Sequence, residues 1–235
     1  MSERLQKIRV AEAESHTKTY TNHALFTPGS WLAKPVKTVL ELLPLLKDYK
    51  DFRGLDLGCG VGRNCIPLAQ FLHSIPCHLD CVDILPLAIE KLTENAEQFQ
   101  VSHAINGIVS SIDDYSIHPG SYDFVLAISA LEHVDSKETF LEKLYAIRDG
   151  LRSEGIACLI VNSSIREWDK NTGTPLPPQF EVNLSTEEMH YLLKSVFSGW
   201  EVLKHTIVHQ KYDIPRSHGI SALEAGVVTW VVRNH

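Results

Sequence analysis

The chain has 235 residues, of which 44% are hydrophobic and 22% are charged. This length and composition suit a single α/β domain with a full-sized core. The net charge of −7 argues against a broad nucleic-acid-binding surface, because such surfaces are strongly basic. The first residues lack the apolar core of a signal peptide, and no stretch is long and apolar enough to cross a bilayer. We therefore expect a cytoplasmic protein with neither a membrane nor a nucleic-acid partner.

The cysteines and the histidines near them do not predict a metal site. The five cysteines stand at positions 59, 65, 77, 81 and 158, mostly in apolar patterns that indicate reduced core thiols. His73 and His78 lie close to Cys77 and Cys81, but no Cys-x-x-Cys pair occurs. Cys77 and Cys81 fall on a predicted strand, where residues four apart are about 13 Å distant. We expect no bound metal.

The N-terminal part of the chain is polar and reads as a segment separate from the core. Residues 1 to about 30 predict a helix followed by a loop. Pro35 then opens an amphipathic helix that runs to about Asp48, because proline is favoured in the first turn of a helix. Pro44 lies inside this pattern and is expected to kink or end the helix. We divide the chain into an N-terminal segment, 1–35, and a main domain, 36–235.

The most informative stretch is Gly54-Leu-Asp-Leu-Gly-Cys-Gly-Val-Gly-Arg-Asn64, an apolar strand followed by a glycine turn and a helix. Glycines at 58, 60 and 62 permit positive φ and let a ligand approach the backbone amides. The helix, expected from Asn64 to about His73, directs the positive end of its dipole toward the same turn. The spacing Gly-x-Gly-x-Gly differs from the dinucleotide fingerprint Gly-x-Gly-x-x-Gly.

With Asp56 two residues before the first glycine, this stretch resembles motif I of the class I S-adenosylmethionine-dependent methyltransferases. The resemblance extends weakly over about residues 36–232. It implies a Rossmann-like three-layer α/β/α sandwich, whose seven-stranded, mostly parallel sheet has an antiparallel last strand. It also implies S-adenosylmethionine as cofactor and O- or N-methylation of a small molecule. The Gly-Arg-Asn after the turn is similar to small-molecule, tellurite-resistance-type and protein N-terminal methyltransferases, and in the last group the arginine matching Arg63 pairs with the methionyl carboxylate.

Asp83 ends the second predicted strand, His78–Asp83, 25 residues after Gly58 (83 − 58). Nucleotide-binding α/β folds place a carboxylate near this offset to accept hydrogen bonds from both ribose hydroxyls. The alternative is that Asp83 caps the helix predicted from Pro86 to about Phe99. We favour ribose binding.

The third predicted strand, 104–110, leads to the residues that the resemblance implies for adenine, Ser111, Ile112 and Asp113. Many family members carry an acidic residue at the place of Ser111, so this chain departs from the common pattern. The adenine amino group is then expected to meet Asp113 or a backbone carbonyl, and Ile112 to supply apolar contact. Alternatively, Asp113 belongs to a solvated helix start.

The fourth strand, Tyr122–Ser129, is apolar throughout and fits the middle of a parallel sheet. It leads to Leu-Glu-His at 131–133, which in the resembling family lies near the transferable methyl group. His133 is our candidate general base, because a neutral imidazole has a pKa near physiological pH. The alternative is a histidine that serves only the core or a helix cap. The resemblance places the following residues at the cofactor: Asp56, Gly58, Cys59, Gly60, Arg63, Asp83, Ile84, Ser111, Ile112, Asp113 and Ile128.

The rest of the chain predicts a helix from Ser136, a fifth strand at 155–161, a helix from Ser185, and strands at 200–208 and 226–232. Between them, residues 162–184 form a long polar loop, which such folds place at the carboxyl end of a strand beside the substrate. Trp168 and Glu181 from this loop, together with Tyr20 from the N-terminal segment as part of a lid, are candidate substrate residues.

Two rival functions remain open at this level. An NAD-dependent oxidoreductase is disfavoured by the early third glycine. A non-catalytic protein that binds S-adenosylmethionine is compatible with the same motifs, because methyl transfer requires no unique catalytic residue. The sequence does not indicate the acceptor or the oligomeric state.

Overall fold

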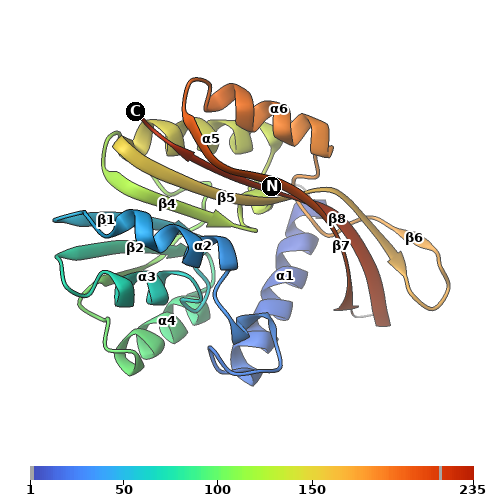
Figure 1. Cartoon of the computed structure of the whole chain (residues 1–235). Helices are drawn as coiled ribbons and strands as arrows, with labels where there is room; N and C mark the ends of the chain where they lie inside the picture. Colours follow the sequence, from blue (N-terminus) through green and yellow to red (C-terminus); the bar gives the residue numbers. More distant parts are fainter. Residues whose placement is uncertain (1–2, 217–218) are drawn as a thin grey trace.

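A single mixed sheet organises the chain in the computed structural model, which describes residues 3–216 and 219–235 (Figure 1). The strand order is β3-β2-β1-β4-β5-β8-β7, and the short β6 pairs with β5. The first five strands run parallel, whereas β8 is antiparallel to both β5 and β7. The strands are β1 Phe52–Leu57, β2 Cys77–Asp83, β3 Ile105–Val109, β4 Tyr122–Ile128, β5 Leu151–Asp169, β6 Pro175–Leu176, β7 Glu201–Arg216 and β8 Gly219–Arg233. The predicted mostly parallel sheet with an antiparallel last strand is confirmed, with β6 as an addition.

Helices cover both faces of this sheet, and each face has its own core. The helices are α1 Glu3–Asn22, α2 Lys37–Leu42, α3 Cys65–Phe71, α4 Pro86–Gln98, α5 Lys137–Gly150 and α6 Thr186–Val196. One core joins α2, α3 and α4 to alternate strand residues such as Phe52 and Phe124. The other joins α5 and α6 to the intervening residues such as Leu55 and Val125. Because successive side chains of a strand point to opposite faces, the apolar runs of β1 and β4 supply both cores. In the part of the chain that the structure describes, no helix combines the length and apolarity needed to span a membrane.

Proline divides the helix that was predicted from Pro35 to Asp48. The α-helix α2 ends at Leu42, and a 3₁₀ helix continues over Leu43–Leu46. Pro44 lies in the first turn of that 3₁₀ helix, where its missing N–H costs no hydrogen bond. The expected interruption at Pro44 is confirmed, whereas the single long helix was wrong.

Strand β5 is longer than the sequence pattern indicated. It continues through Asp169, so the irregular segment begins at residue 170 and the predicted loop start at 162 was wrong. The extension is polar yet ordered because its backbone pairs with β8 from Arg166 to Asp169. Strands β7 and β8 are likewise longer than predicted and extend with β5 beyond the layered body (Figure 1).

The N-terminal helix α1 lies beside the carboxyl ends of the parallel strands and next to the extension of β7 and β8 (Figure 1). Only Ile8 and Tyr20 of its twenty residues are buried. Polar contacts also attach α1 to the body, since Arg9 pairs with Asp113 and Asp135. The helix is therefore attached to the body mainly at its charged inner side.

Helix α5 provides a test of the local structure. Ser136 is its N-cap, in extended conformation, and its Oγ accepts a hydrogen bond from the Thr139 N–H at 3.1 Å. Replacing Ser136 with alanine should lower the free energy of unfolding by about 1 kcal/mol, because a helix N–H loses its acceptor. Urea denaturation measures this change. Ser136→Asp should retain most of the stability, and an alanine variant as stable as the wild type would contradict the capping role.

Candidate active site

A cavity of 1440 Å³ opens at the carboxyl ends of β1, β2 and β4. Its walls come from α1, the glycine turn, the 3₁₀ helix Leu131–His133, the segment around Phe180 and strand β7. A drug-sized ligand needs roughly 300–1000 Å³. The cavity therefore has room for a nucleoside cofactor and a second small molecule. The predicted site residues that line it are Tyr20, Gly58, Cys59, Gly60, Arg63, Asp83, Ile84, Ser111, Ile112, Asp113, Ile128, His133 and Glu181.

The glycine turn is tied to both neighbouring strand ends. The N–H groups of Gly58 and Cys59 donate to the Val82 carbonyl at 2.8 and 3.0 Å. Gly58 has a φ of 72°, and a Cβ at this position would lie 2.5 Å from the Ala130 Cβ. Any larger residue would therefore push the turn away from the chain that follows β4. The turn provides a narrow backbone wall, as the sequence predicted.

Asp83 connects the end of β2 to this turn. Its Oδ2 accepts from the Gly60 N–H and its Oδ1 from the Leu85 N–H, both at 2.9 Å. Burial raises the pKa of this carboxyl group, and its backbone hydrogen bonds oppose this increase. The local cap and the ribose site were alternatives in the sequence, but a carboxylate has about four acceptor positions, and the backbone amides of Gly60, Leu85 and Ile84 use three of them. Asp83 therefore retains acceptor capacity toward the cavity.

Asp56, the acidic residue of the first motif, lies beneath the turn. It is almost completely buried and is absent from the described residues that line the cavity. Burial raises its pKa to about 7, the charge of Asp83 adds to the shift, and a hydrogen bond with the Cys65 thiol opposes it. Its Oδ2 has no hydrogen-bond partner among the described residues. The structure thus places Asp56 behind the cavity wall.

Aromatic side chains close the cavity over the glycine turn. The Tyr20 hydroxyl lies 2.9 Å from the position that a Cβ on Gly60 would occupy. The rings of Tyr20 and Trp31 contact each other edge to face, with centroids 6.0 Å apart. The guanidinium of Arg63 lies 5.4 Å from the centroid of Trp31, and its Nε donates to the Lys34 carbonyl at 2.8 Å. The N-terminal segment therefore contacts the motif directly.

The predicted adenine residues occupy the rim beyond β3. Ser111 lines the cavity, but its Oγ is engaged with Asp114, in a hydrogen bond to Oδ2 at 2.6 Å and one from the backbone N–H at 3.0 Å. Asp113 accepts from the Asp135 N–H at 2.7 Å and pairs with Arg9 at 3.1 Å. The alternative of a purely solvated Asp113 is thus wrong, since its carboxylate links α1 to the chain after β4.

His133 forms a pair with Glu181 at the far side of the cavity. Its Nδ1 lies 2.9 Å from Glu181 Oε2, and its ring stacks on Phe180 with centroids 5.2 Å apart. Burial lowers the pKa of His133, but the hydrogen bond that its Nδ1–H donates to Glu181 and the charge of Glu132 raise it more, to about 9. At neutral pH the imidazole is therefore protonated, which corrects the expectation of a neutral base.

Glu132, the neighbour of His133, holds this part of the site in place. It is fully buried, and its Oε1 accepts hydrogen bonds from the backbone and side-chain amides of Asn162. Its carbonyl accepts from the Val182 N–H at 2.9 Å, next to Glu181. Glu132 therefore links the histidine and the glutamate segments to β5.

Arg9, Glu12 and His16, one helical turn apart on the cavity side of α1, were missed by the sequence analysis, and their spacing on a helix was the one available sign. Arg216, which the sequence offers as a contact for an anionic substrate group or as a surface arginine, lies at the end of β7 and lines the cavity. Trp168, a predicted substrate residue, lies instead on β5, paired with Ala222 and Pro175 outside the described cavity lining. Within residues 3–216 and 219–235, no group of three or more metal-ligating side chains occurs.

Residues 55–155, which include the glycine turn, Asp83 and His133, match the family model described as a methyltransferase domain. Two relatives from Rauvolfia serpentina are ajmaline N-methyltransferase, 26% identical over 56% of this chain, and norajmaline N-methyltransferase, 27% identical over 40%. The matched parts span 46% and 31% of those relatives.

Solved structures of similar fold include TehB from Haemophilus influenzae, which matches with a TM-score of 0.63 and 17% identity over 95% of this chain and 67% of its own. A SAM-dependent methyltransferase from Methanosarcina mazei matches with a TM-score of 0.56 and 14% identity, over 86% of this chain and 98% of its own. The [4+2]-cyclase SpnF matches with a TM-score of 0.60 and 13% identity, over 97% and 95%. The family model therefore identifies residues 55–155 as a methyltransferase domain, and the solved structures show that most of the chain shares the fold of SAM-dependent methyltransferases.

Proposed function

We propose that this protein transfers the methyl group of S-adenosylmethionine to an oxygen or nitrogen atom of a small molecule. The observation that carries the proposal is the joint placement of the glycine turn, Asp83 and His133 around one cavity. The turn and Asp83 hold a nucleoside in folds of this kind, and His133 stands where the acceptor would approach. The relatives that methylate nitrogen support the same reaction class.

The residues in the half of the cavity next to the glycine turn fit S-adenosylmethionine. The bare backbone at Gly58 and Gly60 leaves space that a Cβ would fill. Asp83 keeps an acceptor position for a ribose hydroxyl, and the half-exposed Ile84 offers an apolar surface beside it for the base. Arg63 lines the same end, and its guanidinium is suited to the methionyl carboxylate because it grips carboxylates in a bidentate manner. We assign Ser111, Ile112 and Asp113 to the adenine side.

S-adenosylmethionine supplies a methyl group on a sulfonium sulfur, which leaves as a neutral thioether when a nucleophile attacks the methyl carbon. The protein chiefly needs to orient the acceptor toward that carbon and to exclude water. Helix α1, with Tyr20, covers the turn and forms the lid of the site. The segment from 170 to 184, which carries Phe180 and Glu181, closes the acceptor side.

His133 and Glu181 handle the proton that an acceptor hydroxyl or ammonium must lose. The histidine carries its proton at neutral pH, so it accepts another group's proton only after losing its own. Glu181 holds the Nδ1 edge, which leaves the opposite ring nitrogen, Nε2, as the atom that exchanges protons with the acceptor. The fraction of molecules in which His133 is deprotonated, and can therefore act as a base, increases as the pH rises toward 9.

A non-catalytic cofactor-binding protein is the second candidate. The fold alone does not decide between the candidates, since it is shared by a [4+2]-cyclase, which is named for a different reaction. Binding of S-adenosylhomocysteine without any methyl transfer to a metabolite extract would favour this candidate.

The cofactor assignment predicts selective binding. In calorimetry, S-adenosylmethionine and S-adenosylhomocysteine should bind, and NAD should not. Asp83→Asn should weaken S-adenosylhomocysteine binding by about 10- to 100-fold, because hydrogen bonds to a charged carboxylate are lost. Asp80→Asn, on the same strand but outside the cavity lining, should bind like the wild type. Equal affinity of the Asp83 variant would contradict the ribose assignment.

The role of His133 predicts a loss of turnover without a loss of cofactor. His133→Ala should reduce transfer of labelled methyl groups to a metabolite extract by about 100-fold or more, the usual contribution of a general base. Its affinity for S-adenosylhomocysteine should stay unchanged. The exposed His73 provides the control, and His73→Ala should retain full turnover. Unchanged turnover in the His133 variant would remove this residue from the chemistry.

The His133 and Glu181 pair predicts a distinct pH dependence. Because the folded pKa of about 9 exceeds the unfolded value of about 6.5, the pair stabilises the fold fully below pH 6.5. This stabilisation is lost as the pH rises through 9. An NMR titration of the imidazole protons, assigned with His133→Gln, should show the raised pKa in the wild type and a lower one in Glu181→Gln. A wild-type pKa at or below 6.5 would contradict the pairing.

A further inference from the structure

The half of the cavity next to β7 contains a carboxylate, Glu12, whose ion pair is long and is made to an arginine that a second carboxylate holds more closely. Glu12 lies on the cavity side of α1, with Oε1 at 3.5 Å from Arg216 Nη1 and Oε2 at 3.7 Å from His16 Nε2. Both distances exceed the length of a good charged hydrogen bond. Burial lowers the pKa of His16, so this neighbour is neutral at physiological pH.

The nearby charged groups are already paired with others. Arg216 binds Glu167 in a bidentate manner, at 2.9 Å through Nε and 3.1 Å through Nη2. Both partners are nearly buried, so the charge of this arginine is compensated without Glu12. On the other side, His133 satisfies Glu181 at 2.9 Å. Glu12 therefore lacks the close ion pair that Glu167 and Glu181 each have.

An apolar wall faces this carboxylate. Val208, Tyr212 and Ile214 share one face of β7 and line the cavity, because alternate residues of a strand point to the same side. Val208 and Tyr212 are 50% and 38% exposed, so the protein leaves this wall open. Burial raises the pKa of Tyr212 to about 12, and the charges of Glu132 and then Glu12 add to the shift, which places Glu12 within electrostatic reach of the wall.

A single carboxylate beside exposed apolar side chains fits one class of ligand. An ammonium group gains a charge-assisted hydrogen bond from the carboxylate, and an apolar body covers the wall. A carboxylate ligand would instead be repelled, and a purely apolar ligand would leave Glu12 desolvated with only its long contact to Arg216. The carboxylate and the apolar wall therefore both favour a ligand with an ammonium group and an apolar body.

Building on the proposed function, we propose that the methyl acceptor is an amine with an aromatic or aliphatic body, and that Glu12 binds its ammonium group. The ammonium nitrogen has no free electron pair while it is protonated. It is thus the anchoring group of the acceptor, and it becomes nucleophilic only after its proton has left. Glu12 acts here as a binding residue that selects acceptors with a positive charge.

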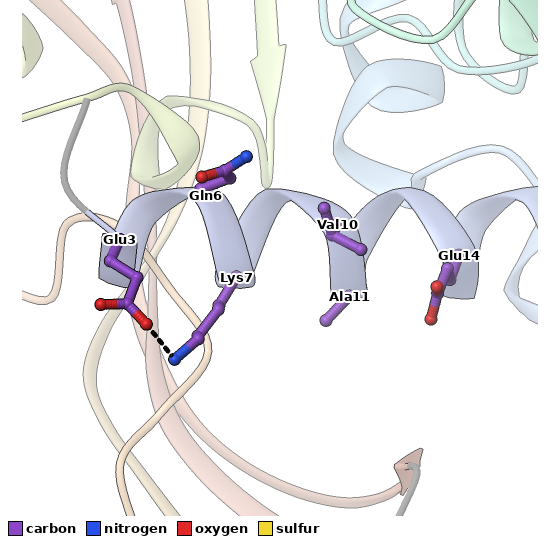
Figure 2. A pocket seen from close by; sticks show the side chains of 6 residues that line it. All are labelled: Glu3, Gln6, Lys7, Val10, Ala11 and Glu14. Carbon is purple, nitrogen blue, oxygen red and sulfur yellow. Dashed lines mark hydrogen bonds and ion pairs between the residues drawn. The ribbon is translucent and has the colours of Figure 1, made fainter.

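Helix α1 itself offers the control. Figure 2 shows its outer side, where Glu14 projects away from the body in a row with Glu3, Lys7 and Ala11, and Glu3 and Lys7 form an ion pair at 2.6 Å. Glu14 is exposed and is absent from the described residues that line the large cavity. Glu14→Gln removes the same charge from the same helix, two residues from Glu12, without changing the cavity.

The test measures binding of tryptamine and of indole-3-propionic acid by calorimetry, with the protein saturated with S-adenosylhomocysteine. The two probes share an aromatic body and differ in the sign of their charge. Tryptamine should bind at least about tenfold more tightly than the acid. Glu12→Gln should weaken tryptamine binding by about tenfold or more and leave S-adenosylhomocysteine binding unchanged, whereas Glu14→Gln should behave like the wild type.

The outcomes separate this inference from the proposed function. If S-adenosylhomocysteine fails to bind, the proposed function fails. If it binds but tryptamine does not bind, binds no better than the acid, or binds Glu12→Gln as well as the wild type, the inference is overturned and the cofactor assignment stands. Equal weakening by Glu12→Gln and Glu14→Gln would also overturn it, because the effect would then come from the overall charge of the helix.

Discussion

The hydrogen bond between the Gly60 N–H and the Asp83 carboxylate is the contact on which the site depends. It joins the turn after β1 to the end of β2, while the missing Cβ of Gly58 lets the chain after β4 lie against the same turn. Three strand ends thereby meet at one point. Because parallel strands place their carboxyl ends at one edge of the sheet, groups that are 25 to 75 residues apart in the chain share one cavity.

The parts of the site that follow directly from a strand were predictable from the sequence. The glycine turn, Asp83 and His133 each stand at the end of an apolar run, and the fold brings such positions together. The extension of β5 was not predictable in this way. Asn162 and Ser163 look like loop residues, but they are buried because Glu132 and Gly226, 30 and 63 residues away, satisfy them. A sequence pattern does not show a distant partner of a polar side chain.

The same limit explains why α1 contributed so little to the prediction. A helix with two buried residues has almost no apolar stripe, so its inner side carries no hydrophobic periodicity. Its contacts are ionic instead, from Arg9 to Asp113 and Asp135 more than 100 residues away. A helix held by charges is easier to release than one held by an apolar core, because water solvates the separated charges. The polar composition that left α1 without a periodic signal would therefore suit the lid that we propose.

Charge also distinguishes the two halves of the cavity. Toward the glycine turn, Arg63 stands beside an aromatic ring and a backbone carbonyl, which leaves a cation available to a carboxylate ligand. Toward β7, Arg216 and His133 each have a closer carboxylate than Glu12, whose own ion pair is long. A cofactor with a carboxylate at one end and an acceptor with a cation would therefore each meet the opposite charge, and exchanging their places would oppose like charges in a partly desolvated space. The pairing of residues behind the cavity walls, more than the walls themselves, thus determines the direction in which two ligands lie.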